Sequence, residues 1–442
     1  MSRPSASTLL DARVIAGRTT ARRWGFRIGW TVLDQAFVSG ANFVLSILLA
    51  RWLSADAFGT YAVVTAVFLF LVNLQSAVVL EPMSIFGAAE EHSSVPAYLT
   101  STAWIQSGIG FGFGLLTLVG AAVASAHDRT TVIALGWMLP LMLLPWYTRR
   151  VCYLRMRPDV AALSSFAYAV LLTVLALALR HADRLTSASA IYATGAASLI
   201  AAAVAWSQVR APIGGVKWAG ARLGLDATIR RHWGYGKWVV LYAVLYLGVG
   251  PIQTFVAAWL VGYDAAGALR ALLVFTMPPF QVITALTSML FLPIVARDFA
   301  RGDMRSVQAR TWALFIGLLA FAIVYEFALF IFASRLERVL YHGKYAGSAW
   351  LIPVLGLLPI FNAAASGFVT TLRAAGRPQY FPISGAITAP LGIVSALAMT
   401  YVWGLAGAGI SNIVTSAAPA VVAYVLYRRW ISTGDDHGRL AA

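Results

Sequence analysis

Long apolar stretches separated by short polar segments run through almost the whole chain. The first, Ile28 to Ala50, holds 23 residues and a single acidic side chain, Asp34. As an α-helix it would be about 34 Å long, which is enough to cross a hydrocarbon core of roughly 30 Å. Eleven further stretches follow the same pattern, so the sequence predicts an all-α polytopic membrane protein with about 12 transmembrane helices. The predicted spans are 28–50, 58–80, 98–124, 131–152, 160–180, 187–209, 238–260, 269–296, 311–333, 346–372, 380–402 and 405–427.

Basic residues are distributed unequally between the two sides of this predicted membrane domain. An even number of spans places both termini on one side, and the segments on that side carry 25 of the 33 Lys and Arg residues. Because basic loops mark the cytoplasmic side, both termini are predicted to be cytoplasmic. The expected order is a tail over 1–27, a first lobe over 28–209, a connector over 210–237, a second lobe over 238–427 and a tail over 428–442.

The two halves of the chain contain an internal repeat. Ala-Arg-Trp-Leu at 50–53, followed by Phe58-Gly59, recurs as Ala-Ala-Trp-Leu at 257–260, followed by Ala266-Gly267. With six spans in each half, the halves should be parallel and related by an axis along the membrane normal. The repeat therefore predicts two parallel six-helix lobes around a central cavity, an arrangement typical of transporters whose bundles rock about a binding site.

Composition supports this class and excludes several others. Apolar residues make up 60% of the chain, charged residues 11%, and the mean hydropathy is +0.76, which no ordinary soluble domain shows. The net charge of +16 is interpreted as contact with membrane lipid and not as nucleic-acid binding. One cysteine and six scattered histidines predict no metal site, and no segment has the spacing of a nucleotide-binding loop. No cofactor is expected, so transport would draw on a coupling proton or sodium ion, the membrane potential or the substrate gradient.

Polar side chains form a stripe along the first span. They recur at steps of three and four residues, and the repeat offset of about 207 places polar residues at equivalent positions in the second half. Such faces would line a hydrated cavity, although polar side chains in membranes also form hydrogen bonds between helices. The predicted cavity residues are Gln35, Ser39, Asn42, Ser46, Asn73, Tyr242, Tyr246, Gln253 and Gln281.

Three acidic residues within or at the ends of spans are candidates for function. A carboxylate in the membrane is costly, so Asp34 and Glu326 are candidates for binding a coupling ion. The alternative for Asp34 is an ion pair with Arg27 or with a basic residue at the cytoplasmic mouth. Glu81 ends the second span beside Pro82 and is interpreted as a structural lock that pairs with Arg149 or Arg150.

Several motifs in the first two spans resemble one known family. They are Asp34-Gln35, Asn42-Phe43, Ala50-Arg51, Phe58-Gly59-x-Tyr61, Gln75 and Glu81-Pro82. Together they resemble the opening of the bacterial polysaccharide (O-antigen and exopolysaccharide) flippases, in the multidrug/oligosaccharidyl-lipid/polysaccharide exporter (MOP) superfamily. The resemblance implies a non-enzymatic protein of the bacterial inner membrane, with polysaccharide polymerase machinery as a partner. It would move undecaprenyl-pyrophosphate-linked oligosaccharide across the membrane by alternating access, for polysaccharide biosynthesis.

A pyrophosphate substrate, as the resemblance implies, needs cations at the mouth or inside the cavity. Arginine binds phosphate groups strongly in a low dielectric, and the candidates are Arg149, Arg150, Arg270 and Arg373. Arginines at span ends also extend to the membrane surface without binding any ligand. The chain lacks a dense arginine cluster within its spans, which departs from what a pyrophosphate carrier would be expected to show.

Two other functions are alternatives to a flippase. A cation-coupled multidrug antiporter of the same superfamily would need acidic residues in its cavity, and only Asp34 and Glu326 could supply them. A membrane polysaccharide polymerase or glycosyltransferase would typically need a large loop or an acidic sugar or metal site, and the sequence shows neither.

Overall fold

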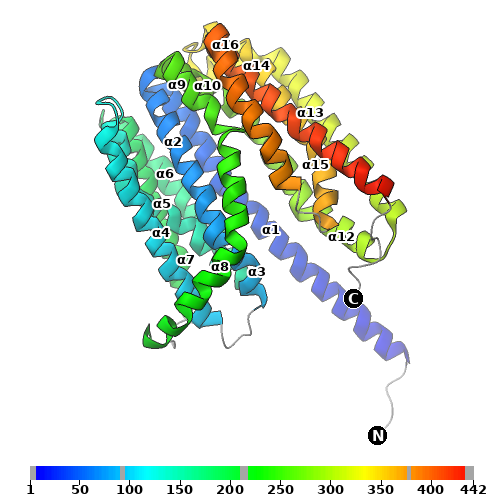
Figure 1. Cartoon of the computed structure of the whole chain (residues 1–442). Helices are drawn as coiled ribbons and strands as arrows, with labels where there is room; N and C mark the ends of the chain where they lie inside the picture. Colours follow the sequence, from blue (N-terminus) through cyan, green and yellow to red (C-terminus); the bar gives the residue numbers. More distant parts are fainter. Residues whose placement is uncertain (1–5, 90–94, 210–217, 376–379, 434–442) are drawn as a thin grey trace.

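The structure, a computed structural model, describes residues 6–89, 95–209, 218–375 and 380–433, and the helices of these residues form two lobes (Figure 1). The prediction of an all-α membrane protein is confirmed, since the described residues form helices and contain no strand. The first half comprises α1 (Ala6–Trp52), α2 (Ala55–Gln75), a π-helical turn (Ser76–Leu80), α3 (Glu81–Ala89), α4 (Val95–Val123), α5 (Arg129–Leu154), α6 (Pro158–His181) and α7 (Ser187–Val209).

The second half is broken into more pieces. Its helices are α8 (Trp218–Leu247), α9 (Pro251–Leu260), α10 (Tyr263–Leu273), a 3-10 turn (Val274–Thr276), α11 (Met277–Ala285), a π-helical turn (Leu286–Phe291), α12 (Leu292–Ala300), α13 (Met304–Tyr341), a 3-10 turn (Ala346–Ser348), α14 (Leu351–Leu355), α15 (Leu357–Ala374) and α16 (Tyr380–Thr433).

The number of spans agrees with the sequence pattern. Eleven helical segments of the described residues are long and apolar enough to cross a membrane. The last of them contains Gly404, whose backbone φ of 56° and ψ of −132° interrupt the helix. An L-residue with a side chain rarely adopts this conformation, so glycine makes the bend. The segment therefore holds two of the twelve predicted spans, 380–402 and 405–427.

Some predicted boundaries differ from the observed ones. No helix boundary separates the predicted 1–27 tail from the first span, because α1 runs unbroken from Ala6 to Trp52 and contains no proline. Residues 210–217 of the predicted connector lie outside the described residues, and the rest of the connector begins α8. The predicted span 238–260 is divided at Gly248–Gly250, because two glycines precede Pro251 and a proline cannot continue the hydrogen-bond ladder.

The lobes meet closely at the end of the molecule that lies away from the chain termini (Figure 1). There α2 crosses α10. A Cβ atom added to Gly59 would lie 1.9 Å from the carbonyl oxygen of Tyr263, and one added to Gly267 would lie 2.3 Å from that of Ala55. Only glycine permits backbones to approach so closely. The two glycines that mark the internal repeat thus pack against each other, and we call this end of the molecule the closed end.

Candidate functional site

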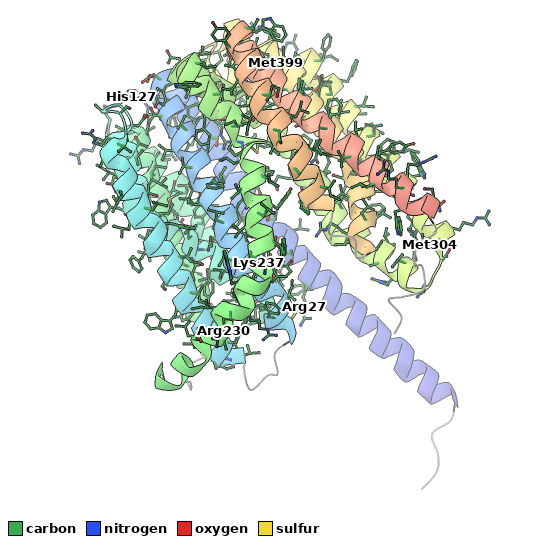
Figure 2. All side chains as sticks on the ribbon, viewed as in Figure 1. Arg27, His127, Arg230, Lys237, Met304 and Met399 are labelled. Carbon is green, nitrogen blue, oxygen red and sulfur yellow. The ribbon has the colours of Figure 1, made fainter. Side chains whose placement is uncertain are left out.

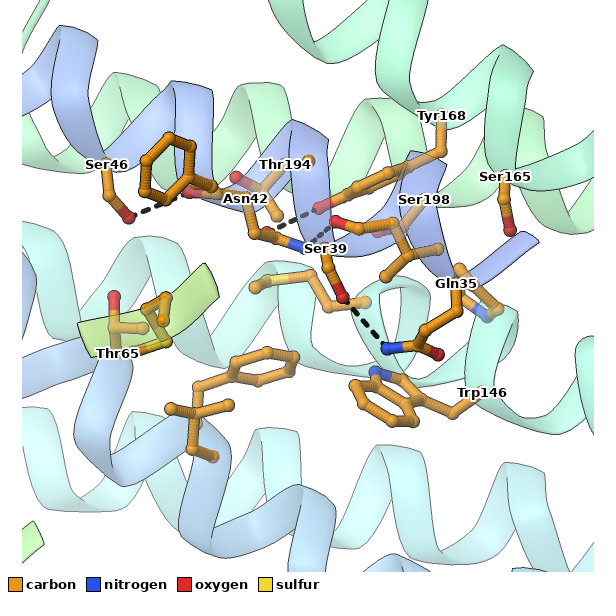
Figure 3. Close-up of a pocket in the computed structure, with 18 of the residues that line it drawn as sticks. Gln35, Ser39, Asn42, Ser46, Thr65, Trp146, Ser165, Tyr168, Thr194 and Ser198 are labelled. Carbon is orange, nitrogen blue, oxygen red and sulfur yellow. Dashed lines mark hydrogen bonds between the residues drawn. The ribbon is translucent and has the colours of Figure 1, made fainter. Parts of the chain in front are cut away.

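A cavity of about 490 Å³ lies against the inner face of the first lobe. Helices α1, α2, α5, α6 and α7 form most of its wall, and the second lobe contributes α10, α11 and the 3-10 turn between them. Figure 3 shows hydroxyl, amide and aromatic side chains facing one another across it. Its polar and aromatic lining residues are Gln35, Ser39, Asn42, Phe43, Ser46, Tyr61, Thr65, Phe68, Trp146, Arg149, Ser164, Ser165, Tyr168, Thr194, Ser198, Arg270 and Gln281.

The polar stripe of the first span lies on the cavity wall (Figure 3). Nε2 of Gln35 donates to Oγ of Ser39 at 2.8 Å, and the hydroxyl of Ser46 donates to the carbonyl oxygen of Asn42 at 2.8 Å. The hydroxyl of Tyr168, on α6, donates to Oδ1 of Asn42 at 3.2 Å. The side-chain amides of Gln35 and Asn42 are thus held at the cavity wall by hydrogen bonds to neighbouring side chains.

The second half contributes less of its predicted polar face. Gln281 lines the cavity, and its Oε1 accepts a hydrogen bond from Nε2 of Gln35 at 3.2 Å, which links the two lobes. Gln253 lies instead in the interior of the second lobe and donates to the hydroxyl of Thr415. Tyr242 and Tyr246 do not line this cavity. The break at 248–250 explains the difference, because residues before and after it no longer share one helix face.

Asn73 is also outside the cavity lining. Its Nδ2 donates to the carbonyl oxygen of Leu69, one turn earlier on α2, at 3.0 Å. The repeat offset pairs Asn73 with Gln281, but the structure brings only Gln281 to the cavity.

Asp34 is fully buried and forms an ion pair within the first lobe. Nη2 of Arg149 lies 2.7 Å from its Oδ2, and Nε of Arg149 lies 2.9 Å from its Oδ1. The hydroxyls of Tyr153 and Ser165 also donate to the carboxylate. Of the two interpretations of Asp34, this geometry is that of an ion pair, with Arg149 of α5 and not Arg27 as the partner. The carboxylate in turn orients the guanidinium of Arg149 at the cavity wall.

Arg270 has a different environment. It lines the cavity from α10, one helical turn after Gly267, and therefore lies just beneath the closed end. Its Nε is buried without a hydrogen-bond partner, and no carboxylate of the described residues forms an ion pair with its guanidinium. Within the part of the chain that the structure describes, Arg270 is thus a cation whose charge no acid compensates.

The remaining charged candidates lie away from the cavity. Arg150 and Arg373 are close enough to Glu81 for their charges to act on its carboxylate. Arg149, the other predicted partner of Glu81, pairs with Asp34 instead. None of Glu81, Arg150 and Arg373 lines the cavity.

Glu326 lies on α13 in the second lobe, against the junction between α14 and α15. A Cβ atom added to Gly356 would lie 1.5 Å from its Oε2, so the carboxylate occupies the space that the missing side chain leaves. That Oε2 is buried and has no hydrogen-bond partner. Glu326 does not line the cavity, although both lobes contribute to the cavity wall.

Sequence reasoning missed much of the wall that α5, α6 and α7 provide. Ser164, Ser165 and Tyr168 recur at helical spacing on α6, as do Thr194 and Ser198 on α7. The same polar periodicity that identified the stripe of α1 would have found them. Trp146 has no such signal, because an aromatic residue in an apolar span is equally typical of packing or lipid contact.

The lining determines what the cavity can bind. Amides, hydroxyls and aromatic rings suit a polar, uncharged ligand such as a sugar, and Arg149 and Arg270 add positive charge. No Asp or Glu of the described residues lines the cavity. The described residues also contain no cluster of three or more metal-ligating side chains.

Sequence comparison finds no match, whereas structure comparison finds proteins of the same fold. No protein-family model and no curated protein match the chain. An inward-facing structure of a multidrug resistance MATE family transporter of the MOP superfamily matches with a TM-score of 0.73 at 11% identity, covering 92% of this chain and 96% of that one. The lipid II flippase MurJ, in an inward closed conformation, matches with a TM-score of 0.68 at 11% identity, covering 90% of this chain and 87% of that one.

A third match is a MOP superfamily transporter from Pyrococcus furiosus, described as having a binding pocket of reverse polarity that suggests a different function. Its TM-score is 0.58 at 12% identity, and the match covers 94% of both chains. The chain therefore shares the fold of MOP superfamily transporters. At these identities, the comparison shows the fold alone.

Proposed function

We propose that this protein is a flippase that moves an undecaprenyl-pyrophosphate-linked oligosaccharide across the bacterial inner membrane by alternating access. The observation that carries the proposal is the charge of the cavity. Two arginines and no carboxylate of the described residues line it, and the buried carboxylate of Asp34 pairs with one of them, Arg149. Such a cavity attracts an anionic ligand and disfavours a cationic one.

The fold does not distinguish this proposal from a multidrug antiporter, because the matching structures include both a multidrug transporter and a lipid flippase. The charges that line the cavity support the flippase over the antiporter. An accessible carboxylate in the cavity would attract an organic cation. Here the side chain of Asp34 is 0% exposed. Its carboxylate already accepts hydrogen bonds from Nε and Nη2 of Arg149 and from the hydroxyls of Tyr153 and Ser165. The lining thus favours the lipid-linked substrate.

The two chemical parts of this substrate match two parts of the lining. Arg270 supplies the uncompensated cation for the pyrophosphate, since arginine forms paired hydrogen bonds to phosphate oxygens. Asn42, Gln35 and Trp146 supply the amide and aromatic groups that bind sugar hydroxyls and ring faces. Arg149 is held by Asp34 and leaves less of its charge for the ligand.

The remaining parts of the proposal follow from the distribution of basic residues. Both termini and the basic loops face the cytoplasm, so the closed end faces the periplasm and the substrate enters from the cytoplasmic leaflet. The exported unit would then pass to polysaccharide polymerase machinery. Glu326, the unpaired acid of the second lobe, is the better candidate for a coupling proton than Asp34.

The experiment that tests this function uses a strain that lacks the protein. We expect loss of surface or extracellular polysaccharide and accumulation of lipid-linked repeat units on the cytoplasmic leaflet. Complementation with wild-type protein should reverse both effects, Arg270→Ala should not, and Arg338→Ala, which alters an exposed arginine outside the cavity, should do so fully. Unchanged polysaccharide and unchanged lipid-linked pools, in a strain with no second flippase, would disprove the proposal.

A further inference from the structure

The closed end of the molecule is held by polar contacts as well as by the crossing of Gly59 and Gly267. The most buried of these contacts come from the short segment that follows α13 in the second lobe. This segment reaches across the lobe boundary to the C-terminal end of α1, where the first lobe presents carbonyl oxygens that its own helix leaves unpaired.

Lys344 makes the central contact. Its Nζ donates to the carbonyl oxygen of Ala50 at 2.8 Å and also to that of Leu53. The last four carbonyl groups of a helix lack partners within the helix and carry the negative end of its dipole, so a lysine is well suited to cap them. In this structure the cap comes from the opposite lobe.

The surroundings of Lys344 hold it in this position. Tyr345 is 4% exposed, and its hydroxyl lies 3.4 Å from the same Ala50 carbonyl oxygen. Oε1 of the buried Glu337 accepts a hydrogen bond from the Tyr345 backbone N–H at 2.8 Å, which anchors the segment to α13. Burial lowers the pKa of Lys344, against a smaller opposite effect of Asp264. The amine is therefore partly withdrawn from water, and the α1 carbonyls replace part of its hydration.

A second set of contacts joins the lobes on the other side of the crossing. The Tyr263 hydroxyl, on α10, donates to Asp128 in the loop between α4 and α5. His127 lies in that loop, at this end of the first lobe (Figure 2). The centroid of its ring is 4.8 Å from that of the Tyr263 ring. Its Nε2 is 2.7 Å from the hydroxyl of Thr60 and 3.2 Å from a carboxylate oxygen of Asp56. The His127 and Asp56 side chains are 42% and 47% exposed, so their ion pair contributes little.

We propose that Lys344 is the lock of the closed end: by capping α1 from the opposite lobe it holds the cavity shut on this side, and its release opens it. The inference rests on the proposed alternating-access transport but concerns a part of the molecule distant from the ligand. A transporter must break every contact that joins its lobes at the closed end in each cycle. Both hydrogen bonds of the cap come from one amine, so they break together when the lobes separate. The amine and the two carbonyl oxygens then regain hydrogen bonds to water.

The test measures the separation of the lobes directly and without substrate. Spin labels are placed at Ala182→Cys in the first lobe and Tyr401→Cys in the second, both exposed at the closed end, in a Cys152→Ala background. Distances are measured by double electron–electron resonance in lipid nanodiscs. The wild-type protein should show mainly the short distance of the closed end.

Lys344→Met removes the charge and keeps an unbranched side chain. We expect it to raise the ratio of open to closed protein at least about tenfold, because hydrogen bonds to a charged group are lost. Arg338→Met is the matched control, since the Nε of Arg338 bonds only to the Ser334 carbonyl oxygen of its own helix. Lys344→Arg, which retains the charge and the donors, should restore much of the closed population.

Gly59→Ala provides a second, independent disturbance. Its Cβ would collide with the Tyr263 carbonyl, whereas Gly317→Ala, which meets nothing within 4 Å, is the control. A Lys344→Met distribution identical to that of Arg338→Met would overturn the proposal, and if Gly59→Ala alone opened the molecule, the glycine crossing would be the lock instead. Because no substrate is present, failure here leaves the flippase function standing, and failure of the polysaccharide assay leaves the lock standing.

Discussion

The interpretation of Asp34 depends on its neighbours in the structure, above all on Arg149. From the sequence, an acid two turns inside a span suggests ion coupling or an ion pair with equal weight. The structure surrounds it with an arginine, a tyrosine and a serine from two other helices. Arg149 lies 115 positions away in the chain, so no local pattern could have identified it as the partner.

Removing the charge of Asp34 should therefore damage stability. Asp34→Asn leaves Arg149, which is 13% exposed, without its counter-ion, and breaking a buried pair in this way typically costs about 3–5 kcal/mol. We expect a large drop in the thermal unfolding midpoint in detergent, with partial recovery in the double variant Asp34→Asn/Arg149→Gln. Asp183→Asn, at an 89% exposed side chain, is the control. A stable Asp34→Asn protein whose transport has lost its pH dependence would instead identify Asp34 as a coupling site.

Removing the charge of Glu326 should have the opposite effect on stability to removing that of Asp34. Its Oε2 is buried without a partner, so an isosteric neutral side chain removes an uncompensated charge and breaks no ion pair. We expect Glu326→Gln to keep or raise the unfolding midpoint and to abolish the dependence of transport on a proton gradient. The measurement is polysaccharide-precursor transport in proteoliposomes at matched and unmatched pH. Transport by Glu326→Gln that still responds to the gradient would exclude Glu326 as the proton carrier.

At the scale of elements, the apolar pattern predicted the spans well but not their internal breaks. The positions of long apolar runs depend only on the length needed to cross a bilayer, which the sequence contains directly. The π-helical turn at 76–80 depends instead on a contact with α8, where Nδ1 of His232 lies 3.0 Å from the Val78 carbonyl oxygen. A π-turn leaves carbonyl groups without their usual partners, and a side chain from another helix satisfies this one.

This contact gives a prediction for α8. His232 is 1% exposed and also bonds through Nε2 to the hydroxyl of Tyr98 at 2.9 Å. His232→Phe keeps a ring but leaves the Val78 carbonyl and the Tyr98 hydroxyl buried without partners, which should destabilise the protein by about 1–3 kcal/mol per group. Hydrogen exchange of 76–80 should rise in this variant. The control variant is His342→Phe, which changes an exposed histidine. Equal hydrogen-exchange protection of 76–80 in the two variants would show that His232 does not hold this segment.

At the scale of the whole molecule, the internal repeat was the most informative sequence feature. It predicted two parallel lobes, and it marked Gly59 and Gly267, which the structure packs together at the closed end. The repeat was less informative about the cavity. The helix is interrupted between α8 and α9, and α8 packs against α4 and the 76–80 turn of the first lobe. The cavity is therefore asymmetric, with Gln281 and Arg270 as the main polar contribution of the second lobe.

Asymmetry also explains why the charge of the cavity could not be read from the sequence. Of the four candidate arginines, Arg270 is the one that the sequence places inside a span and that is hardest to explain as a span-end residue. The structure separates the four further: Arg149 pairs with Asp34, Arg150 and Arg373 lie near Glu81, and no acid of the described residues pairs with Arg270. Each pairing depends on which helices meet, and hydropathy does not contain that information. We propose that the uncompensated cation of Arg270 selects an anionic substrate.

One measurement tests this claim most directly. Purified protein in nanodiscs is titrated with undecaprenyl pyrophosphate and, separately, with an organic cation such as tetraphenylphosphonium, and binding is followed by the shift in thermal unfolding. We expect the anionic lipid to stabilise the wild-type protein, the cation to have no effect, and Arg270→Ala to weaken anion binding at least about tenfold while Arg338→Ala does not. Stabilisation by the cation, together with an Arg270→Ala variant that binds it as well or better, would contradict the account and identify the protein as a cation transporter.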